Sequence, residues 1–557
     1  MSFFFCNFAR GNVFFITAEK FFSMKARIVS ILVLAIGLCT NVHGTVYEMT
    51  VTNTETWVNT VLAGRQVGDT IHFSVPVIVN RNYGYSGFSG LTMSVRRIFS
   101  PTNQELPLSP EYQNLLTLNS RAGFNLQGCG YHRNGERLHD LKAVVTGSLK
   151  VKYISGKWEG NNTREAIETN VPSVDMNGTH NVLVCGANLE YYLAQNLGTG
   201  YGPDNQTEHN RQKTKVCTAL ARIHADVYGL VEIEQGQVAL AEIADYLTSA
   251  TGSHYSYVND KGSPDGSYTK SAYIYNSDRI QPVGELSSNN QGVKKRKFAQ
   301  GFILLENNER FIYSINHFKA KSGSGTGLDA DQGDGQGIFN HARVLEARSV
   351  LQSLSSYQNY YKDNDVLIMG DLNAYAKEDP IRVFTDAGLY DLHRYFHEDS
   401  SYSYVYGEQA GYLDHAIANP ALINQVTGMA VWHVNSDESD EYTYDKSYDQ
   451  TVFRYSDHDP VLVGLRLDST KSSSAVVENL IEQCRIGVID GQSYLMNVGE
   501  MGEENGYYEI YGIRGEQVQG VTVIEDSPCL IGEGLPGGVY LVRIYYAGKT
   551  RTMKMLK

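Results

Sequence analysis

The pattern of apolar and polar positions divides the chain into regions of different character. From Thr45 to residue 176, short alternating runs such as Thr70-Ile71-His72-Phe73-Ser74-Val75 predict β-strands, and amphipathic helix patterns are scarce. We therefore expect a small all-β barrel in this region. From residue 177 to 468, apolar runs of strand length alternate with amphipathic helix patterns. Such alternation predicts a layered α/β domain.

The α/β pattern predicts two helices, at Glu208–His224 and Phe339–Leu354. The strands that it predicts lie at Asn181–Ala187, Asp226–Val231, Phe311–Asn316, Asp365–Met369 and Val461–Leu467. A Ser/Thr-rich linker, 469–474, then leads into β-like sequence that ends at Lys557. With an upstream extension and signal segment over 1–44, we expect domains at 45–176, 177–468 and 469–557.

The beginning of the chain predicts export. Ile28 to Leu38 is an apolar run of signal-peptide length that follows a basic start at Met24-Lys25-Ala26-Arg27, so Met24 is a candidate true start. No later segment has the length and apolar character of a membrane span. Cys484 and Cys529 are candidates for a disulfide in the tail, which the sequence leaves open. The oligomeric state is also left open.

Composition is that of a globular protein, and the net charge of −14 argues against a protein that coats DNA by bulk charge. It is compatible with an acidic pocket that binds a metal ion. No Cys/His cluster with zinc-site spacing occurs.

Polar side chains lie at the ends of the predicted α/β strands, where ligand sites form. Carboxylates there are hard oxygen ligands of the kind Mg²⁺ prefers, and a histidine can hydrogen-bond or protonate a phosphoryl oxygen. Asp and Asn two positions apart point the same way from extended backbone, so one can accept a proton from water while the other holds the water. The residues are Asn188, Glu190, Glu232, Glu234, His317, Lys319, Lys321, Asp371, Asn373, Asp414, Asp457 and His458.

Taken singly, each of these motifs is also compatible with a turn, a cap or a solvated surface. Their order, however, resembles that of the endonuclease/exonuclease/phosphatase superfamily, the DNase I-like enzymes. The motifs that carry this resemblance are NLE at Asn188, VEIE at Glu232, NHFKAK at His317, GDLNAY at Asp371, YLDHA at Asp414 and SDHDPV at Asp457.

The resemblance implies a four-layered α/β sandwich with a metal at the sheet edge. It implies Glu232 as the principal metal ligand with Asn188 and Asp457 nearby, and Mg²⁺, with Mn²⁺ or Ca²⁺ as alternatives. It further implies catalytic roles and substrate contacts. Asp371 activates water, Asn373 positions it, Asp414 orients His458 toward the phosphate, and His317 serves the leaving oxygen. Lys319 and Asn188 are the expected substrate contacts.

Nucleic acid is the expected substrate, DNA first and RNA second. The β-rich first region resembles the OB-like module of secreted bacterial nucleases at Ile98-Phe99-Ser100-Pro101-Thr102-Asn103, and OB folds bind single strands. A basic patch, 294–297, points the same way, and Tyr402 to Tyr406 are candidates for base stacking. A sphingomyelinase-type phosphodiesterase and a non-catalytic surface-binding protein are the alternatives.

The glycine-rich loop 322–340 carries Asp329, Asp331 and Asp334, but its spacing does not fit an EF-hand. We interpret it as a loop over the site, and the sequence leaves open whether it binds a second metal ion. The tail, with Gly538-Val539-Tyr540-Leu541-Val542-Arg543-Ile544 and a basic end, resembles the C-terminal sorting domain of the bacterial type IX secretion pathway. That resemblance implies the type IX secretion machinery as a partner, and a secreted or outer-membrane surface-attached protein.

Overall fold

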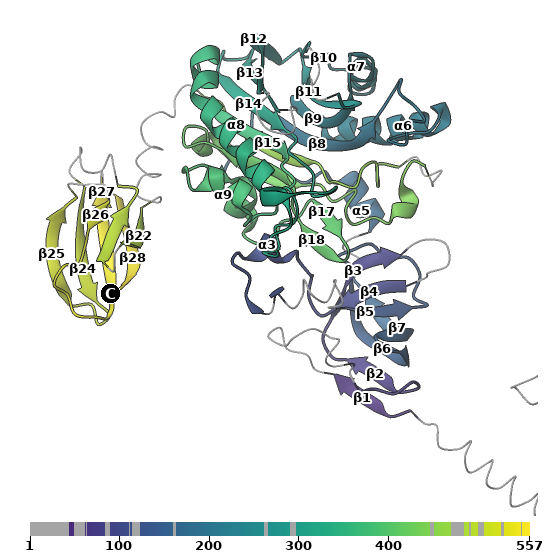
Figure 1. Cartoon of the computed structure of the whole chain (residues 1–557), viewed down its shortest axis with the longest axis horizontal. Coiled ribbons are helices and arrows are strands. Elements are labelled where there is room, and N and C mark those ends of the chain that lie inside the picture. The colour runs from purple at the N-terminus through teal and green to yellow at the C-terminus, as the bar shows by residue number, and fades with distance from the viewer. Residues whose placement is uncertain are drawn as a thin grey trace, which may run out of the picture. The chain divides into compact units, whose positions relative to one another are not determined.

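The fold is described from a computed structural model of the chain (Figure 1). The residues it describes are 44–49, 62, 64–83, 90–110, 112–113, 123–159, 163–260, 266–289, 297–445, 451–468, 484–489, 492–498, 506–524, 528–546 and 549–557. The predicted signal segment, residues 294–296 of the basic patch and the 469–474 linker lie outside them. Two compact units divide the chain: residues 1–98 with 118–163, and residues 99–117 with 164–557.

The first unit contains a closed β-barrel. The barrel strands are β3 (Val77–Tyr83), β4 (Gly90–Ser94), β5 (Phe124–Gln127), β6 (Arg137–Gly147) and β7 (Lys150–Trp158). Neighbours pair in the order β6-β3-β4-β5-β7, and a further β6–β7 pairing closes the barrel. The β5–β7 pair is parallel, and β1 (Val46–Met49) and β2 (Thr70–Phe73) extend the sheet beside β6. Alternate apolar side chains of these strands form one core, as the period-two pattern predicted.

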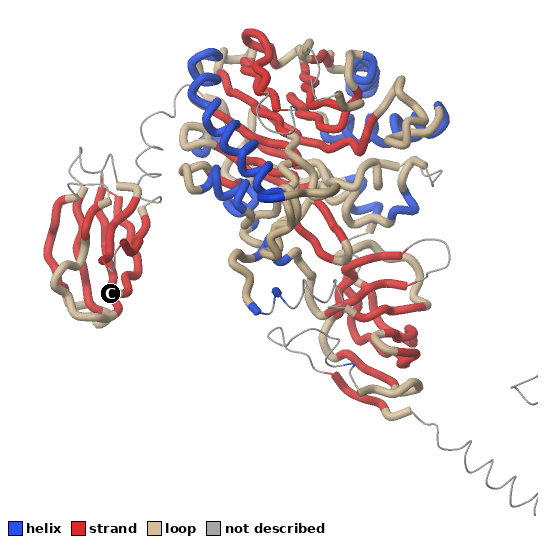
Figure 2. Tube along the Cα trace, in the orientation of Figure 1, coloured by secondary structure: helices blue, strands red, loops and turns tan. Residues whose placement is uncertain are grey.

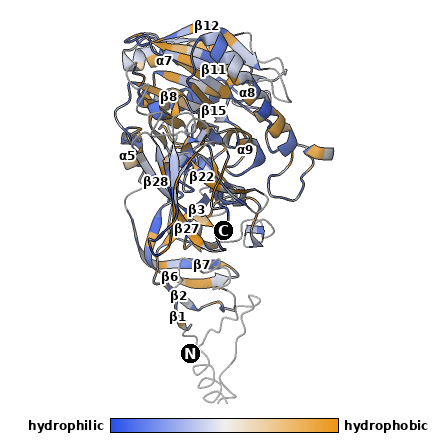
Figure 3. Cartoon of the chain, turned by 90° about the vertical axis from the view of Figure 1, so that its left-hand side faces the viewer, coloured by the Kyte–Doolittle hydropathy of each residue, from blue (hydrophilic) through white to orange (hydrophobic). Residues whose placement is uncertain are grey.

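The second unit is built on two six-stranded sheets. The first sheet has the order β10 (Tyr255–Tyr257), β11 (Thr269–Asn276), β9 (Val227–Glu234), β8 (Val182–Tyr192), β21 (Val461–Leu465), β20 (Val426–Val431). The second has the order β12 (Ile280–Asn289), β13 (Lys297–Leu304), β14 (Arg310–Asn316), β15 (Val366–Asp371), β19 (Asp414–Ala418), β16 (Tyr390–Asp391). Hydrophobic residues, orange in Figure 3, recur along these strands, because most of them are buried on both faces.

Helices cover the outer faces of the two sheets, so the core has four layers (Figures 1 and 2). The apolar faces of α6 (Gln206–Ile223) and α7 (Val238–Thr251) pack on the first sheet. Those of α8 (Asn340–Tyr361) and α9 (Asp379–Thr385) pack on the second, and a third core lies between the sheets. The mixed α/β architecture agrees with the expected DNase I-like core. No helix among the described residues is both long and apolar enough to cross a membrane.

Two buried tyrosines join the sheets. The Tyr313 hydroxyl, from the second sheet, donates to the Cys185 carbonyl of β8 at 3.1 Å, and the Tyr273 hydroxyl, from β11, donates to the Tyr313 carbonyl at 2.6 Å. Gly229 of β9 lies against the Tyr313 ring so closely that an added Cβ would be 2.2 Å from its hydroxyl oxygen. These contacts fix the spacing of the two sheets whose ends carry the candidate site.

The C-terminal residues form a separate pair of small sheets. One consists of β22 (Arg485–Ile489), β23 (Gln492–Met496) and β26 (Cys529–Leu530), and the other of β25 (Gln517–Val523), β24 (Tyr507–Gly512), β27 (Val539–Tyr546) and β28 (Lys549–Leu556). One apolar cluster fills the space between them. Cys484 and Cys529 both lie in this cluster as free thiols, so the disulfide left open by the sequence is not formed here.

Candidate active site

The ends of β8 and β9 differ from the expected simple strands. We predicted that the polar residues follow strands ending at Ala187 and Val231, but the strands run on to Tyr192 and Glu234. The parallel register jumps between Asn188 and Tyr192, and left-handed backbone at Glu190, Tyr191 and Glu232 makes a β-bulge. Bulges re-aim side chains, and non-glycine residues at positive φ cluster at functional sites. This bulge was not readable from the period-two pattern.

A row of three ionisable groups lies at the edge of the two sheets. His317, directly after β14, places Nε2 at 3.7 Å from both the Glu232 carboxylate of the first sheet and the Asp371 carboxylate of β15. Possible ligand atoms of the three side chains all lie within 4.8 Å of one another. His317 and Asp371 are buried, and the Glu232 side chain is 14% exposed. The sheet pairing therefore brings together three motifs that are far apart in the sequence.

Asp371 is the centre of a network of amide groups. Its carboxylate accepts a hydrogen bond from the Asn373 backbone N–H at 2.8 Å, from Asn373 Nδ2 at 3.1 Å and from Asn188 Nδ2 at 3.3 Å. Gly370 has φ of +123°, and a Cβ there would be 2.1 Å from the Asn316 carbonyl oxygen. Only glycine therefore fits before Asp371, which explains the Gly-Asp pair in this motif.

Asp414 and His458 form a buried dyad. His458 Nδ1 lies 2.7 Å from Asp414 Oδ2, and the Ser403 hydroxyl donates to the same oxygen at 2.6 Å. Burial alone lowers the pKa of His458, but the carboxylates of Asp414, Asp457 and Asp371 outweigh burial and hold it well above its usual range. Asp371, Asp414 and His458 also offer ligand-type atoms within 4.8 Å of one another, so the dyad adjoins the Glu232 row.

Two more acids lie at the site. Asp457 Oδ1 is 3.9 Å from His458 Nε2, and the Asp457 side chain is 34% exposed. Glu190, which sequence reasoning named at a strand end without assigning it a role, has a buried Oε2 atom with no hydrogen-bond partner among the described residues. Burial and the charge of Asp457 raise the pKa of Glu190 to about 8.

The donor set fits a divalent cation. Burial raises the pKa of Asp371 to about 7, with Asp414 and Glu232 adding to the rise and His458 opposing it. Several buried carboxylates that repel each other, one with an unpaired oxygen, are stabilised by a bound dication. The oxygen-rich set with one imidazole is chemically suited to Mg²⁺ or Mn²⁺ rather than to zinc in a thiolate site. Among the described residues, Glu232, His317 and Asp371 form one group with ligand-type atoms close enough to hold it, and Asp371, Asp414 and His458 form another.

The predicted substrate contact Lys319 lies against residues of the glycine-rich segment 322–340. Its Nζ donates to the carbonyls of Ala320 and Ser322 and lies 3.9 Å from the centre of the Phe339 ring. The buried Glu234 carboxylate accepts hydrogen bonds from four N–H groups, those of the Ala194, Gln195 and Asn196 backbone and the Asn196 side chain, the shortest at 2.7 Å. Glu234 thereby fixes the segment after the β8 bulge.

Sequence reasoning missed Ser403 and Arg454 of the site, and it named Tyr404 only as a candidate for base stacking. Ser403 and Tyr404 lie in the Tyr-rich stretch, where Ser403 holds Asp414 and the Tyr404 ring centre is 4.7 Å from that of His458. Arg454 lies in an irregular segment with left-handed backbone and pairs with Asp440. The tyrosine-rich stretch is visible in the sequence and could have pointed to Ser403. Nothing in the sequence points to Arg454, because no strand or helix pattern surrounds it.

A short segment from the first region of the sequence belongs to the second unit. Residues 99–117 contain α3 (Pro101–Gln104), where the Thr102 hydroxyl donates to Glu378 at 2.7 Å and the Asn103 Oδ1 accepts from the Tyr412 N–H at 3.2 Å. Glu378 also pairs with Lys321 Nζ at 2.6 Å. These contacts fasten the backbone that follows Asn373 and the backbone that precedes Asp414.

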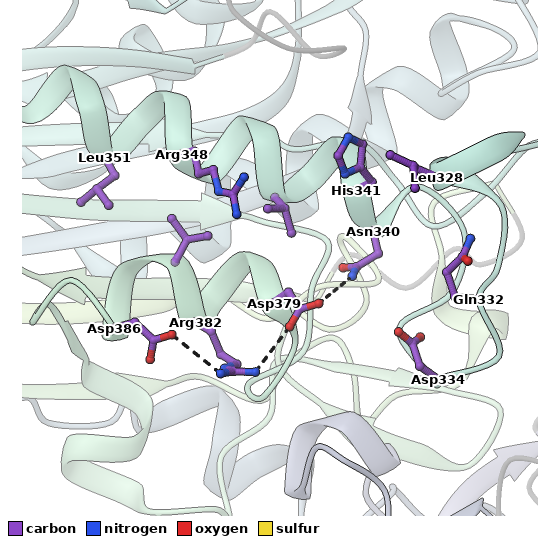
Figure 4. A pocket seen from close by; sticks show the side chains of 12 residues that line it. Leu328, Gln332, Asp334, Asn340, His341, Arg348, Leu351, Asp379, Arg382 and Asp386 are labelled. Atoms are coloured by element: carbon purple, nitrogen blue, oxygen red, sulfur yellow. Dashed lines mark hydrogen bonds and ion pairs between the residues drawn. The ribbon is translucent and has the colours of Figure 1, made fainter. Parts of the chain in front are cut away.

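The aspartates of the glycine-rich loop have local partners. Asp329 and Asp331 accept backbone N–H groups of Ala342 and Gly333, and Asp334 accepts from Gln336. Within the described residues, none of the three joins either carboxylate–histidine cluster. Asp334 lines a groove of about 640 Å³ between the loop, α8 and α9, in which Arg382 pairs weakly with two other aspartates (Figure 4). That groove contains none of the predicted catalytic or metal-binding residues.

The four-layered fold and its carboxylate–histidine edge define a class of phosphoester hydrolase. The model of the Endonuclease/Exonuclease/phosphatase family matches residues 178–458, just over half of the chain, and the chain belongs to this family. Members are hydrolases that act on phosphoesters, commonly with a divalent metal. A comparison with curated proteins finds no match.

Solved structures similar to this chain include the human Nocturnin catalytic domain with bound sulfate, at 15% identity and a TM-score of 0.35, covering 52% of this chain and 94% of that one. A mannosyl-6-phosphatase of Bacteroides thetaiotaomicron has 15% identity and a TM-score of 0.34, covering 51% and 99%. TDP2 of D. rerio with a single-strand DNA product has 14% identity and a TM-score of 0.33, covering 51% and 97%.

Proposed function

We propose that the protein is a secreted, divalent-metal-dependent endonuclease that hydrolyses phosphodiester bonds of DNA, with RNA as a second substrate. The observation that carries the proposal is the joining of Glu232, His317 and Asp371 to the Asp414–His458 dyad at one sheet edge. In this dyad a buried carboxylate orients the imidazole, as in the catalytic triads of serine hydrolases.

The residues divide the chemistry among them. Asp371 accepts the proton of the attacking water, and Asn373, bonded to the same carboxylate, positions that water. Protonated His458 donates a hydrogen bond to a phosphoryl oxygen, with Asp414 holding its ring. We assign to His317, which lies 3.7 Å from Asp371, the stabilisation of the leaving oxygen. Glu232, Asn188 and Asp457 would hold a divalent metal, which would neutralise negative charge on the phosphate.

The barrel supports nucleic acid as the substrate. Its strand order, closed by β6–β7 with β5 parallel to β7, supports the interpretation as an OB-like module, and OB folds bind single strands. Residues 45–98 and 118–163 carry 11 Lys and Arg against 6 Asp and Glu, although the whole chain has a net charge of −14. The hairpin β6–β7 exposes Lys142, Lys150, Lys152 and Lys157. A basic module in an acidic protein suits a polyanionic substrate.

Export and sorting are part of the proposal. The apolar run Ile28–Leu38 supports a secretion signal, and the C-terminal β-structure with its basic end supports sorting by the type IX machinery to the medium or the outer-membrane surface. Fractionation of cells that produce the full chain tests this. Retention of the chain in the cytoplasm would contradict it.

The function is tested by incubating the full chain with plasmid DNA in Mg²⁺ and in EDTA. Wild type is expected to nick and cut only with Mg²⁺, and His458→Ala is expected to be inactive. The matched control His254→Ala removes a histidine that is 75% exposed and outside the site, and it is expected to cut like wild type. Absence of cutting by wild type, or equal cutting by His458→Ala, contradicts the proposal. Sphingomyelin hydrolysis in place of DNA cleavage would favour the lipid alternative.

A further inference from the structure

Two series of tyrosines begin at the candidate active site. In the first, the Tyr191 and Tyr201 rings are stacked with centres 5.0 Å apart and an interplanar angle of 23°, and Tyr268 continues the series at 6.3 Å. Tyr201 is 52% exposed and Tyr268 is 42% exposed. Large aromatic rings that gather on a surface beside catalytic groups are typical of ligand-binding positions.

The first series is tied to the metal-binding side of the site. Tyr191 belongs to the β8 bulge, and its backbone N–H donates to Glu232 Oε2 at 3.1 Å. The left-handed backbone of Tyr191, at φ of +54°, lies in a region unfavourable for a residue with a ring. The surrounding structure therefore holds this ring in place at a local cost, as residues at functional sites do.

The second series begins beside His458 of the Asp414–His458 dyad. The Tyr404 ring centre lies 4.7 Å from that of His458, and the Tyr406 ring is parallel to Tyr404 within 7° at 6.5 Å. Both tyrosines are on β17 (Tyr404–Tyr406), whose partner β18 (Gln409–Gly411) leads into Asp414. Tyr406 is 72% exposed, so its ring is open to a ligand.

The charge of the surrounding residues explains why rings would be needed. Residues 164–468 carry 24 Lys and Arg against 41 Asp and Glu, so this part of the chain cannot hold a phosphate backbone by general attraction. Base–aromatic stacking does not depend on surface charge, and it accepts every base because each has a π-face. Bases inside a duplex already stack on their neighbours, so only unpaired bases present free faces to such rings.

We infer that the Tyr191–Tyr201–Tyr268 and Tyr404–Tyr406 series are stacking platforms for the bases on either side of the scissile phosphate, so that the preferred substrate is single-stranded nucleic acid. The inference rests on the proposed nuclease function and goes further by naming the strand state of the substrate and the subsites that read it. Tyr201 and Tyr406, the most exposed ring of each series, are the test positions.

The experiment measures cleavage of end-labelled single-stranded oligonucleotides by the full chain, with Tyr201→Ala and Tyr406→Ala against wild type. Each substitution is expected to lower kcat/KM by about 5- to 150-fold, the range that loss of one base–ring stack produces. Tyr→Phe at the same positions keeps the ring and is expected to retain activity within about twofold of wild type. Tyr360→Ala removes a ring that is 52% exposed on α8, and it is the matched control expected to have no effect.

Abasic substrates separate stacking from general damage to the site. When the base that meets a given tyrosine is absent, wild type is expected to fall to the level of the alanine variant, and the variant is expected to lose nothing more. The inference is overturned if the alanine variant is still slower than wild type on the abasic substrate, or if it equals wild type on intact strands. In either case, cleavage by wild type upholds the nuclease function. A wild type that cleaves no oligonucleotide but hydrolyses a sugar phosphate or a phospholipid overturns both.

Discussion

Asp414→Asn is the substitution that separates orientation of His458 from the rest of the site. The change keeps the size of the side chain but replaces the charged acceptor of the 2.7 Å contact with His458 Nδ1 by an uncharged amide. A hydrogen bond to a charged group contributes about 1.5–3 kcal/mol, which corresponds to about 10- to 150-fold in rate. We expect kcat on DNA to fall by that factor at neutral pH, with KM little changed because Asp414 is buried and is proposed to act through His458.

The pH dependence adds a second readout. Asp414 is the first of the carboxylates that hold the pKa of His458 above its usual range, so the variant's imidazole loses its proton at a lower pH than wild type. The defect should therefore be smallest in mild acid and grow as the pH rises. Ser403→Ala removes one donor to Asp414 but leaves its charge, and it should cost less than about 10-fold. An Asp414→Asn enzyme within twofold of wild type from pH 6 to 8 would refute the reasoning.

Three further changes test the fold around the site. Tyr273→Phe removes a hydroxyl that accepts the Ile315 N–H at 3.0 Å, and it should lower the free energy of unfolding by about 1–3 kcal/mol in chemical denaturation of the full chain. Glu242→Gln should destabilise by about 1 kcal/mol at neutral pH, because hydrogen bonds from His209 and Lys213 outweigh burial and lower the Glu242 pKa to about 2. This difference is present above the unfolded-state pKa of about 4.3 and should vanish as the pH falls toward 2, which melting curves at several pH values would show. Asn103→Ala should lower the melting temperature and reduce kcat, and an unchanged variant would show that α3 does not support the catalytic backbone.

The sequence was sufficient for α6, α8 and the five strands β8, β9, β14, β15 and β21, but it did not predict others, such as α7 and β11. Buried strands such as β15 stand out as apolar runs, and the polar residues at their ends are the ones that the sheets bring together at His317, Asp371 and His458. The motif at residues 98–103, which we interpreted as part of an OB-like module, was visible in the sequence, but its position in the fold was not. Its α3 residues pack with the second unit, a tertiary contact that local patterns do not encode.

The sequence did not predict the bulge that orients Glu190 and Glu232, and the reason is physical. Period-two alternation reports which face a residue occupies, whereas left-handed backbone at Glu190 and Glu232 depends on pairing between β8 and β9. The same limit hid the tyrosine series, since Tyr191, Tyr201 and Tyr268 come from three separate segments. Their grouping beside Glu232 follows from the fold alone.

The rate of DNA cleavage as a function of Mg²⁺ concentration, compared between wild type, Glu232→Gln and His458→Ala, tests the central claim most directly. Glu232 is the candidate metal ligand and His458 is the candidate phosphate contact. Glu232→Gln should therefore shift the half-saturating Mg²⁺ concentration upward by at least about 10-fold. His458→Ala should lower the maximal rate at an unchanged Mg²⁺ midpoint. Cleavage by wild type that is independent of divalent metal, or full activity with an unchanged midpoint in both variants, would contradict the assignment of this sheet edge as a metal-dependent nuclease site.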